Sequence, residues 1–166
     1  MRYVMALTQN LNYLQPTGFR ILVDSQRFSN FTFFAQSVTH PDLTTSAAEV
    51  RYRSYSSVPQ IPDTFTYGEL NMNIIVDEDM NSYTEIFNWM KVNVESNVKG
   101  PEDPDSSYAD LLLTILTSKN NINKKIKYLN CFPTNIGAIN LESNLEGSTP
   151  TITFPVTFRY TYFTIE

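Results

Sequence analysis

The sequence has few of the side chains that catalysis, metal binding and covalent cross-linking require. It contains one cysteine, Cys131, which excludes an intrachain disulfide, and one histidine, His40, so a site built from several His and Cys ligands cannot form. The five glycines are scattered and make no phosphate-binding loop. We therefore expect a protein that is not an enzyme and that carries no cofactor or metal.

Long hydrophobic runs are also missing. No apolar stretch approaches the length of a membrane-spanning helix, and the first residues lack the apolar core and cleavage site of a signal peptide. These absences predict a soluble protein that is made in the cytoplasm and has no membrane partner.

The net charge of −5 is unevenly distributed along the chain. Eleven acidic and two basic residues lie between Asp63 and Asp110, whereas the remainder holds six acidic and ten basic residues. This asymmetry indicates either one acidic and one basic surface for partners, or solvated loops on the two sides of a helix. Four lysines, Lys119, Lys124, Lys125 and Lys127, form a basic cluster. The last three of them are candidates for assembly contacts.

Phenylalanine and tyrosine are plentiful, and their alternation with polar residues favours a mainly β fold in a single domain over residues 1–166. The clearest pattern lies in residues 151–165, where apolar side chains occupy every second position. Pro155 lies within this run and requires an edge, a bulge or a position whose nitrogen points outward; the length of the run indicates that it extends beyond its own domain or bends at Pro155. We expect strands at Gly18–Asp24, Phe31–Thr39, Ala47–Tyr55, Glu69–Asp77, Asp110–Ser118, Lys125–Phe132, Ala138–Glu142 and Thr151–Ile165.

One α-helix is expected at about residues 82–95. Ser82 and Glu85 have the spacing of a capping box, in which each side chain satisfies a free amide of the first turn. Trp89 lies beside the apolar stripe, where its ring either contacts a neighbouring molecule or packs in the core. The stripe that we expect to face the core repeats at helical spacing and consists of Tyr83, Ile86, Phe87, Met90 and Val94.

Three stretches, in order between about Glu69 and Phe163, resemble the tail tube proteins of contractile-tailed bacteriophages. They are GELNMNIIVDEDMNSYTEIFNWM, FPTNIGAINLES and TITFPVTFRYTYF. The first reads as a strand, an acidic turn and a helix. The second holds a Pro-Thr-Asn-hydrophobic-Gly corner, and the third is the alternating C-terminal run.

This resemblance implies an α+β, mainly β fold in which two packed antiparallel sheets form a sandwich or partial barrel with one flanking helix. It also implies a structural virion protein that assembles into stacked hexameric rings, the inner tube of a contractile tail. The expected partners are further copies of the chain, the sheath, and the baseplate and tail-end proteins. Genomic DNA would pass through the lumen without specific binding. The expected location is the tail of the virion, after assembly in the host cytoplasm.

Two alternatives remain open from the residues alone. One is a baseplate protein of the same fold that initiates the tube. The other belongs to a different class, a small ligand-binding β-barrel whose Phe and Tyr faces line a closed cavity.

The polar faces of the expected strands supply candidates for the wall of a lumen. A wall that lacks free cations does not hold a sliding duplex by its phosphates, so acidic and amide side chains suit this position. The lumen candidates are Glu49, Glu69, Asn71, Asn73 and Glu142.

Further candidates for assembly lie in two irregular stretches. Pro59, Ile61 and Pro62 belong to Ser56–Tyr67, which we expect to be an extended loop that contacts the next ring. The corner at 133–137 is expected to reverse the chain at the rim of a sheet, unless it is an ordinary surface turn. Three residues of this corner have special backbone requirements and are assembly candidates: Pro133, Asn135 and Gly137. Trp89 of the expected helix is the last assembly candidate.

Overall fold

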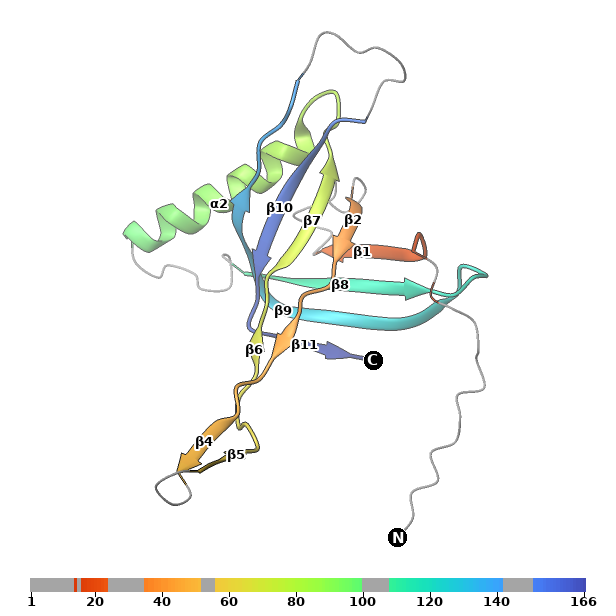
Figure 1. The fold of residues 1–166 in the computed structure, drawn as a ribbon. Coiled ribbons are helices and arrows are strands. Elements are labelled where there is room, and N and C mark those ends of the chain that lie inside the picture. The colour runs from red at the N-terminus through yellow and green to blue at the C-terminus, as the bar shows by residue number, and fades with distance from the viewer. Residues whose placement is uncertain (1–13, 15, 24–34, 52–55, 100–107, 142–150) are drawn as a thin grey trace.

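The computed structural model describes residues 14, 16–23, 35–51, 56–99, 108–141 and 151–166, and two antiparallel sheets form its centre (Figure 1). Sheet A has the order β1–β8–β9–β11, and sheet B the order β9–β10–β7–β2. The strands of sheet A run across those of sheet B. The bounds are β1 Phe19–Val23, β2 Ala35–Thr39, β7 Leu70–Ile75, β8 Ala109–Leu116, β9 Ile122–Ile136, β10 Thr153–Arg159 and β11 Tyr162–Ile165.

The long strand β9 belongs to both sheets. Its first half pairs with β8 and β11, and its second half, from Phe132 onward, pairs with β10. At the change of sheet, Asn130 has a φ of 54°, a left-handed conformation that asparagine tolerates better than most residues. The C-terminal run changes sheets at the same level, between β10 and β11, where the Thr161 amide donates to the Leu129 carbonyl at 3.0 Å.

The hydrophobic core lies between the two sheets and the single described helix, α2 (Asn81–Lys99). Tyr128 of sheet A and Phe154 and Phe158 of sheet B have no exposed surface. Trp89 of α2 is 4% exposed and packs against Phe158, with ring centroids 5.8 Å apart. Alternation decides which side chains enter this core, because every second residue of β7 and β10 faces it.

A narrow arm projects from the sheets and is made of two short ribbons (Figure 1). In the first ribbon β3 pairs with β6, and in the second β4 pairs with β5. The bounds are β3 Leu43–Thr44, β4 Ala48–Arg51, β5 Ser57–Gln60 and β6 Thr66–Tyr67.

The expected fold class is confirmed: the chain is mainly β, with two packed antiparallel sheets and one flanking helix. The sheets do not close into a barrel, and their aromatic faces fill the core, which argues against the ligand-binding β-barrel alternative. Seven of the eight expected strands overlap strands of the structure, although the C-terminal run is divided into β10 and β11. The expected extended loop Ser56–Tyr67 instead holds β5 and β6. The polar loop at residues 100–107 lies outside the described residues.

The expected chain reversal at Pro133–Gly137 is wrong. β9 continues through Pro133 and Asn135 to Ile136, and these residues pair with β10. Residues 138–141 form no strand, contrary to the expectation, and Glu142 lies outside the described part of the chain. The sequence pattern suggested a turn, but proline is also tolerated in a strand at the edge of a sheet. Among the described strands, the second half of β9 is such an edge, so Pro133 needs no backbone N–H on its outer side.

Pro155 lies in β10 between two paired strands rather than at an edge. Its carbonyl accepts a hydrogen bond from the Gly137 amide at 2.7 Å, just beyond the end of β9. In an antiparallel ladder the amide and carbonyl of one residue point to the same neighbour. The missing N–H of Pro155 therefore faces the end of β9 and removes no bond to β7.

The helix begins at Asn81, and the expected capping box is wrong. Ser82 lies inside the first turn, fully buried, and its hydroxyl donates to the Asp77 carboxylate at 2.7 Å. The Asp77 carboxylate also accepts the amides of Asn81 and Ser82, both at 2.9 Å. Burial alone would raise the pKa of Asp77, but these hydrogen bonds outweigh it and lower the pKa to about 2.

The apolar stripe of α2 is present, but most of it does not face the core. The buried face holds Ser82, Ile86 and Trp89. Phe87 and Val94 are exposed, at 51% and 65%. We call the four residues Tyr83, Phe87, Met90 and Val94 the apolar flank of α2.

We predict that Gly137→Ala destabilises the fold by about 1–3 kcal/mol, because a Cβ at this position would overlap the Pro155 ring. Chemical denaturation measures the change. The same substitution in a Pro155→Ala background should cost clearly less, since the ring atoms are then gone. Equal costs in both backgrounds would contradict this explanation.

We also predict that Asp77→Ala lowers the free energy of unfolding by about 1 kcal/mol at neutral pH, because it removes the cap of α2. The pKa of Asp77 is depressed in the folded state, so its contribution is complete above the unfolded value of 3.8 and is lost as the pH falls toward 2. Denaturation curves of both proteins should therefore converge in that range. Asp79→Ala, which removes an exposed charge of the same turn, is the control and should show a smaller effect.

Candidate functional site

The outer face of sheet B is polar and continuous. Asn71 and Asn73 of β7 point away from the core, because they alternate with the buried Leu70, Met72 and Ile74. The Thr157 hydroxyl of β10 donates to the Asn71 side chain at 2.9 Å, and the Asn73 amide donates to the Ser37 hydroxyl of β2 at 3.1 Å. Side chains from three strands thus form one hydrogen-bonded surface.

Charge is nearly balanced on this outer face. Glu69, which precedes β7, lies 3.8 Å from Arg159 of β10, and both side chains are more than half exposed. Such an exposed pair contributes little stability, but it offsets the positive charge of Arg159. Three of the five lumen candidates, Glu69, Asn71 and Asn73, therefore share one surface.

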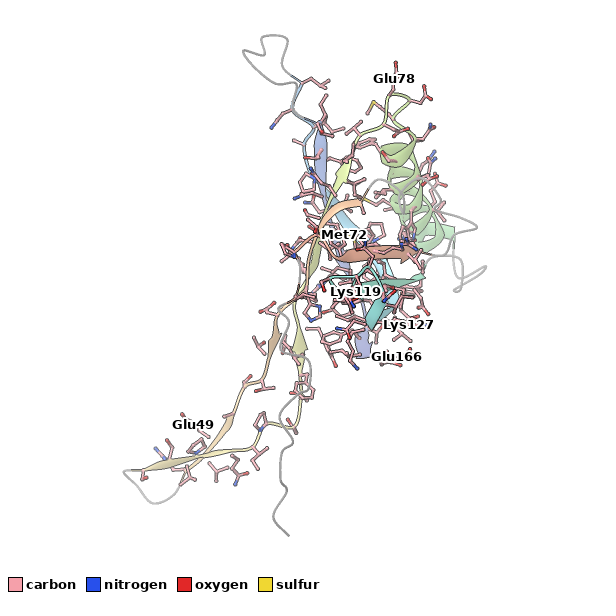
Figure 2. All side chains as sticks on the ribbon, turned by 90° about the vertical axis from the view of Figure 1, so that its right-hand side faces the viewer. Glu49, Met72, Glu78, Lys119, Lys127 and Glu166 are labelled. Atoms are coloured by element: carbon pink, nitrogen blue, oxygen red, sulfur yellow. The ribbon has the colours of Figure 1, made fainter. Side chains whose placement is uncertain are left out.

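The other two lumen candidates do not join them. Glu49 lies on β4 in the arm, far from Met72 of β7 (Figure 2). Glu142 falls outside the described residues. Sequence alternation groups residues only within one strand, so it could not show that β4 leaves the sheet.

The arm carries exposed apolar side chains. Ile61 is 94% exposed, and Pro59, opposite Glu49 in the β4–β5 ribbon, is exposed as well. Pro62 is half-buried. Further large apolar side chains of the arm with an exposed fraction of 45% or more are Leu43, Val50, Val58 and Phe65. An apolar surface on a thin projection has no core of its own to enter, so it is typical of an interaction site.

Aromatic rings fasten the arm to the sheets. Tyr67 of β6 packs edge-on against Tyr160 and Phe163, with centroids 5.9 and 5.6 Å apart. His40, at the other side of the arm's base, shares a hydrogen bond of 2.6 Å with the hydroxyl of the buried Tyr128. Burial lowers the pKa of His40 and raises the pKa of Tyr160 to about 12, so both side chains are neutral at pH 7. This cluster was not found from the sequence, because its members come from four separate segments.

The remaining assembly candidates lie in different places. Trp89 is a core residue, so the core-packing alternative is the correct one. Pro133, Asn135 and Gly137 lie in or just after the second half of β9, at the border of sheet B. Lys124, Lys125 and Lys127 lie in the first half of β9, in sheet A.

Among these lysines, Lys127 forms an ion pair with Asp110 of β8 at 2.8 Å. The hydrogen bond and the charge of Asp110 raise the pKa of Lys127. Lys124 is exposed and Lys125 is half-buried. The basic cluster thus lies in the first half of β9, between β8 and β11 of sheet A, and is separate from the polar face of sheet B.

Within the described residues, no group of three His, Cys, Asp or Glu side chains could hold a metal ion. The single cysteine, Cys131, is buried, and burial raises its pKa to about 12, which disfavours the reactive thiolate. No helix in the same part of the chain is long and apolar enough to cross a membrane.

Comparison with known proteins agrees with a structural role. The sequence model of the phage tail tube protein family matches residues 3–166. The chain belongs to this phage tail tube protein family. It is therefore related to structural components of phage tails rather than to enzymes.

One relative of this tail tube family member is the tail tube terminator protein of Enterobacteria phage T4. The two are 28% identical in an alignment 166 residues long that covers 97% of this chain and 93% of that protein. Two solved structures share the fold at low sequence identity. The tube terminating cap of the anti-feeding prophage has a TM-score of 0.68 at 12% identity and covers 100% of this chain and 99% of that chain. A chain of the sheath–tube complex of the extracellular contractile injection system PVC has a TM-score of 0.66 at 13% identity, over 93% of this chain and 91% of that chain.

Proposed function

We propose that this protein forms the ring that terminates the tube of a contractile tail. The observation that carries the proposal is the 28% identity, over nearly the full length of both chains, to the tail tube terminator of phage T4. The alternatives are the repeating tube subunit and the baseplate protein that initiates the tube, and both would use the same fold.

The free borders of sheet B support ring formation. β2 is the last strand on one side, and on the other side the second half of β9 has no described neighbour beyond β10. The four strands alternate in direction, so β2 and β9 are antiparallel to each other. A copy placed beside the first can therefore pair its β9 with β2 in the favourable antiparallel sense, and closure of the ring removes both edges. Pro133 suits this border, since edge strands accommodate proline.

In such a ring, the polar face of sheet B would line the lumen. Asn71, Asn73 and Thr157 are neutral, and Arg159 is offset by Glu69. A wall of this kind offers the phosphates of a passing duplex no unpaired cation from these positions, so it favours passage without specific binding. The proposed partners are further copies of the chain, the last tube ring, the sheath and proteins of the tail end, with the baseplate for an initiating relative.

The exposed arm supports contact along the tube axis. The arm projects from the sheets (Figure 1), and its exposed apolar side chains, Ile61 and Phe65 among them, suit a groove on an adjoining ring. A terminator must offer one surface that binds the tube and another that accepts no further ring. The apolar surface of the arm would be the one that binds the tube.

Loss of the gene distinguishes the terminator from the repeating subunit. Without a terminator, tails should still contain tubes, but their lengths should vary; without a repeating subunit, no tubes should form. Electron microscopy of particles from a deletion mutant measures this. Quantitative mass spectrometry of intact tails is an independent check: a terminator contributes one ring per tail, whereas the copy number of a repeating subunit scales with tube length.

The lumen assignment predicts the effect of added positive charge. In Glu69→Lys combined with Asn73→Lys, the rings should assemble normally, but delivery of DNA should fall by about tenfold, because new lysine–phosphate contacts retain the duplex. Plaque titres and DNA release in vitro measure the effect. Glu49→Lys on the arm is the control for added charge and should leave DNA release intact. Normal release from the double variant would refute the assignment of this face.

A further inference from the structure

The apolar flank of α2 is only partly covered by the described part of the chain. Tyr83, Phe87, Met90 and Val94 follow one another at spacings of four, three and four residues, so they form one stripe along the helix. Phe87 and Val94 are 51% and 65% exposed, while Tyr83 and Met90 are half-buried beside the core. α2 packs against β9, and its C-terminal part extends past this strand, beyond the border of sheet B (Figure 1).

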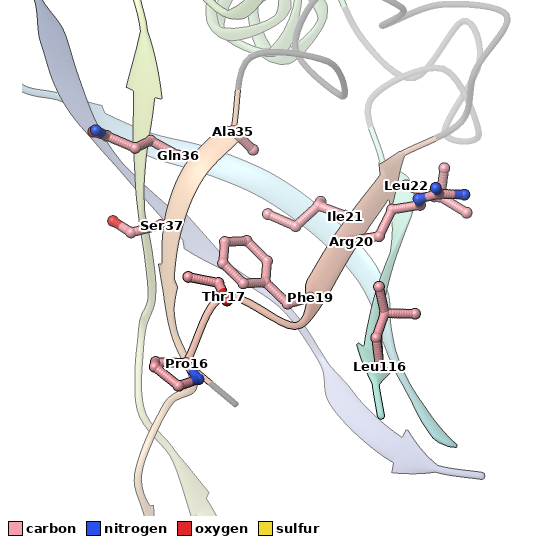
Figure 3. Close-up of a pocket in the computed structure, with 10 residues that line it drawn as sticks. All are labelled: Pro16, Thr17, Phe19, Arg20, Ile21, Leu22, Ala35, Gln36, Ser37 and Leu116. Atoms are coloured by element: carbon pink, nitrogen blue, oxygen red, sulfur yellow. The ribbon is translucent and has the colours of Figure 1, made fainter. Parts of the chain in front are cut away.

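A groove of about 810 Å³ opens on the opposite side of the molecule, between the edge strands β1 and β2 (Figure 3). Phe19, Ile21, Ala35 and Leu116 give it apolar walls, and Thr17 and Ser37 lie at its sides. Here the two sheets, which are joined through β9 elsewhere, stand apart. Both walls are the outermost strands of their sheets, so an occupant that also pairs with a strand edge fits this groove better than a small molecule does.

The two surfaces are arranged head to tail. The flank extends beyond β9 at one border of sheet B, and the groove lies on the core side of β2 at the other border. In each copy, α2 lies on the core side of sheet B. When β9 of one copy pairs with β2 of the next copy, α2 of the first copy therefore comes to lie on the core side of β2 of the second copy. Two different surfaces that meet in this way generate a ring where the rotation between copies closes, and not a two-fold dimer.

We propose that the apolar flank of α2 of one copy occupies the groove between β1 and β2 of the next copy. The inference rests on the proposed ring and names a second contact within it, separate from the strand pairing. Burial of Phe87 and Val94 against Phe19 and Leu116 supplies the apolar area that backbone pairing of two edges lacks.

Single substitutions test the contact. Phe87→Asp and Val94→Asp should weaken ring formation by about tenfold or more each, because each removes an apolar side chain that the groove would bury and puts a hydrated carboxylate in its place. Val92→Asp, on another side of α2 and 43% exposed in the structure, is the matched control and should leave the rings intact. Mass photometry over a concentration series measures ring and monomer, and thermal unfolding followed by circular dichroism shows that each variant is folded.

A cysteine pair tests the geometry directly. Val94→Cys combined with Thr17→Cys should give disulfide-linked multimers under mild oxidation, up to a covalently closed ring. Asn88→Cys combined with Thr17→Cys places the thiol on a different side of the helix and should give few of them. The native Cys131 is buried and takes no part.

The outcomes separate this inference from the proposed function. If the wild-type chain forms rings, but the aspartate variants do so equally well and the cysteine pair leaves only monomer bands, the helix does not occupy the groove and the ring proposal stands. A segment of the same chain in the groove would give this result. If the wild-type chain stays monomeric at every concentration and is absent from tails, the ring proposal fails and this inference fails with it.

Discussion

The fold depends on one strand that pairs in two directions. β9 runs for 15 residues, with β8 and β11 beside its first half and β10 beside its second half. Since the two sheets share it, their faces are held across each other, and Tyr128, Phe154 and Phe158 are enclosed between them. The left-handed backbone at Asn130 allows the change of direction without a break in the strand.

A shared strand on one side leaves the other side open. β1 and β2 end their sheets without a described partner, and the groove lies between them. A monomer gains nothing from unpaired edges and an apolar groove, because both invite contact with other chains. In the proposed ring, the same features are the contacts between copies, and the open side of one copy meets the helix side of the next.

Much of the fold could be predicted from local patterns. The alternation in β7 identified the buried Leu70, Met72 and Ile74 and the outward Asn71 and Asn73, because a strand with one buried face has a period of two. The helix pattern located α2 but assigned its stripe to the core. Helical spacing shows that apolar side chains share a side; it does not show whether that side meets the same chain or another. Trp89, which was placed beside the stripe, is the residue that the core buries.

The sequence by itself determined the composition and the local structure: one histidine, one cysteine and scattered glycines leave few side chains for catalytic or metal sites, and alternation with one helical stretch indicates a mainly β fold. Only the tertiary structure decided that β9 spans both sheets, that Glu49 lies on an arm away from the sheets, and that aromatic rings from four segments hold this arm. The physical reason is range. Periodicity and capping arise from residues within a few positions of one another, whereas strand order and surface complementarity arise from contacts between segments far apart in the chain, which local patterns do not encode.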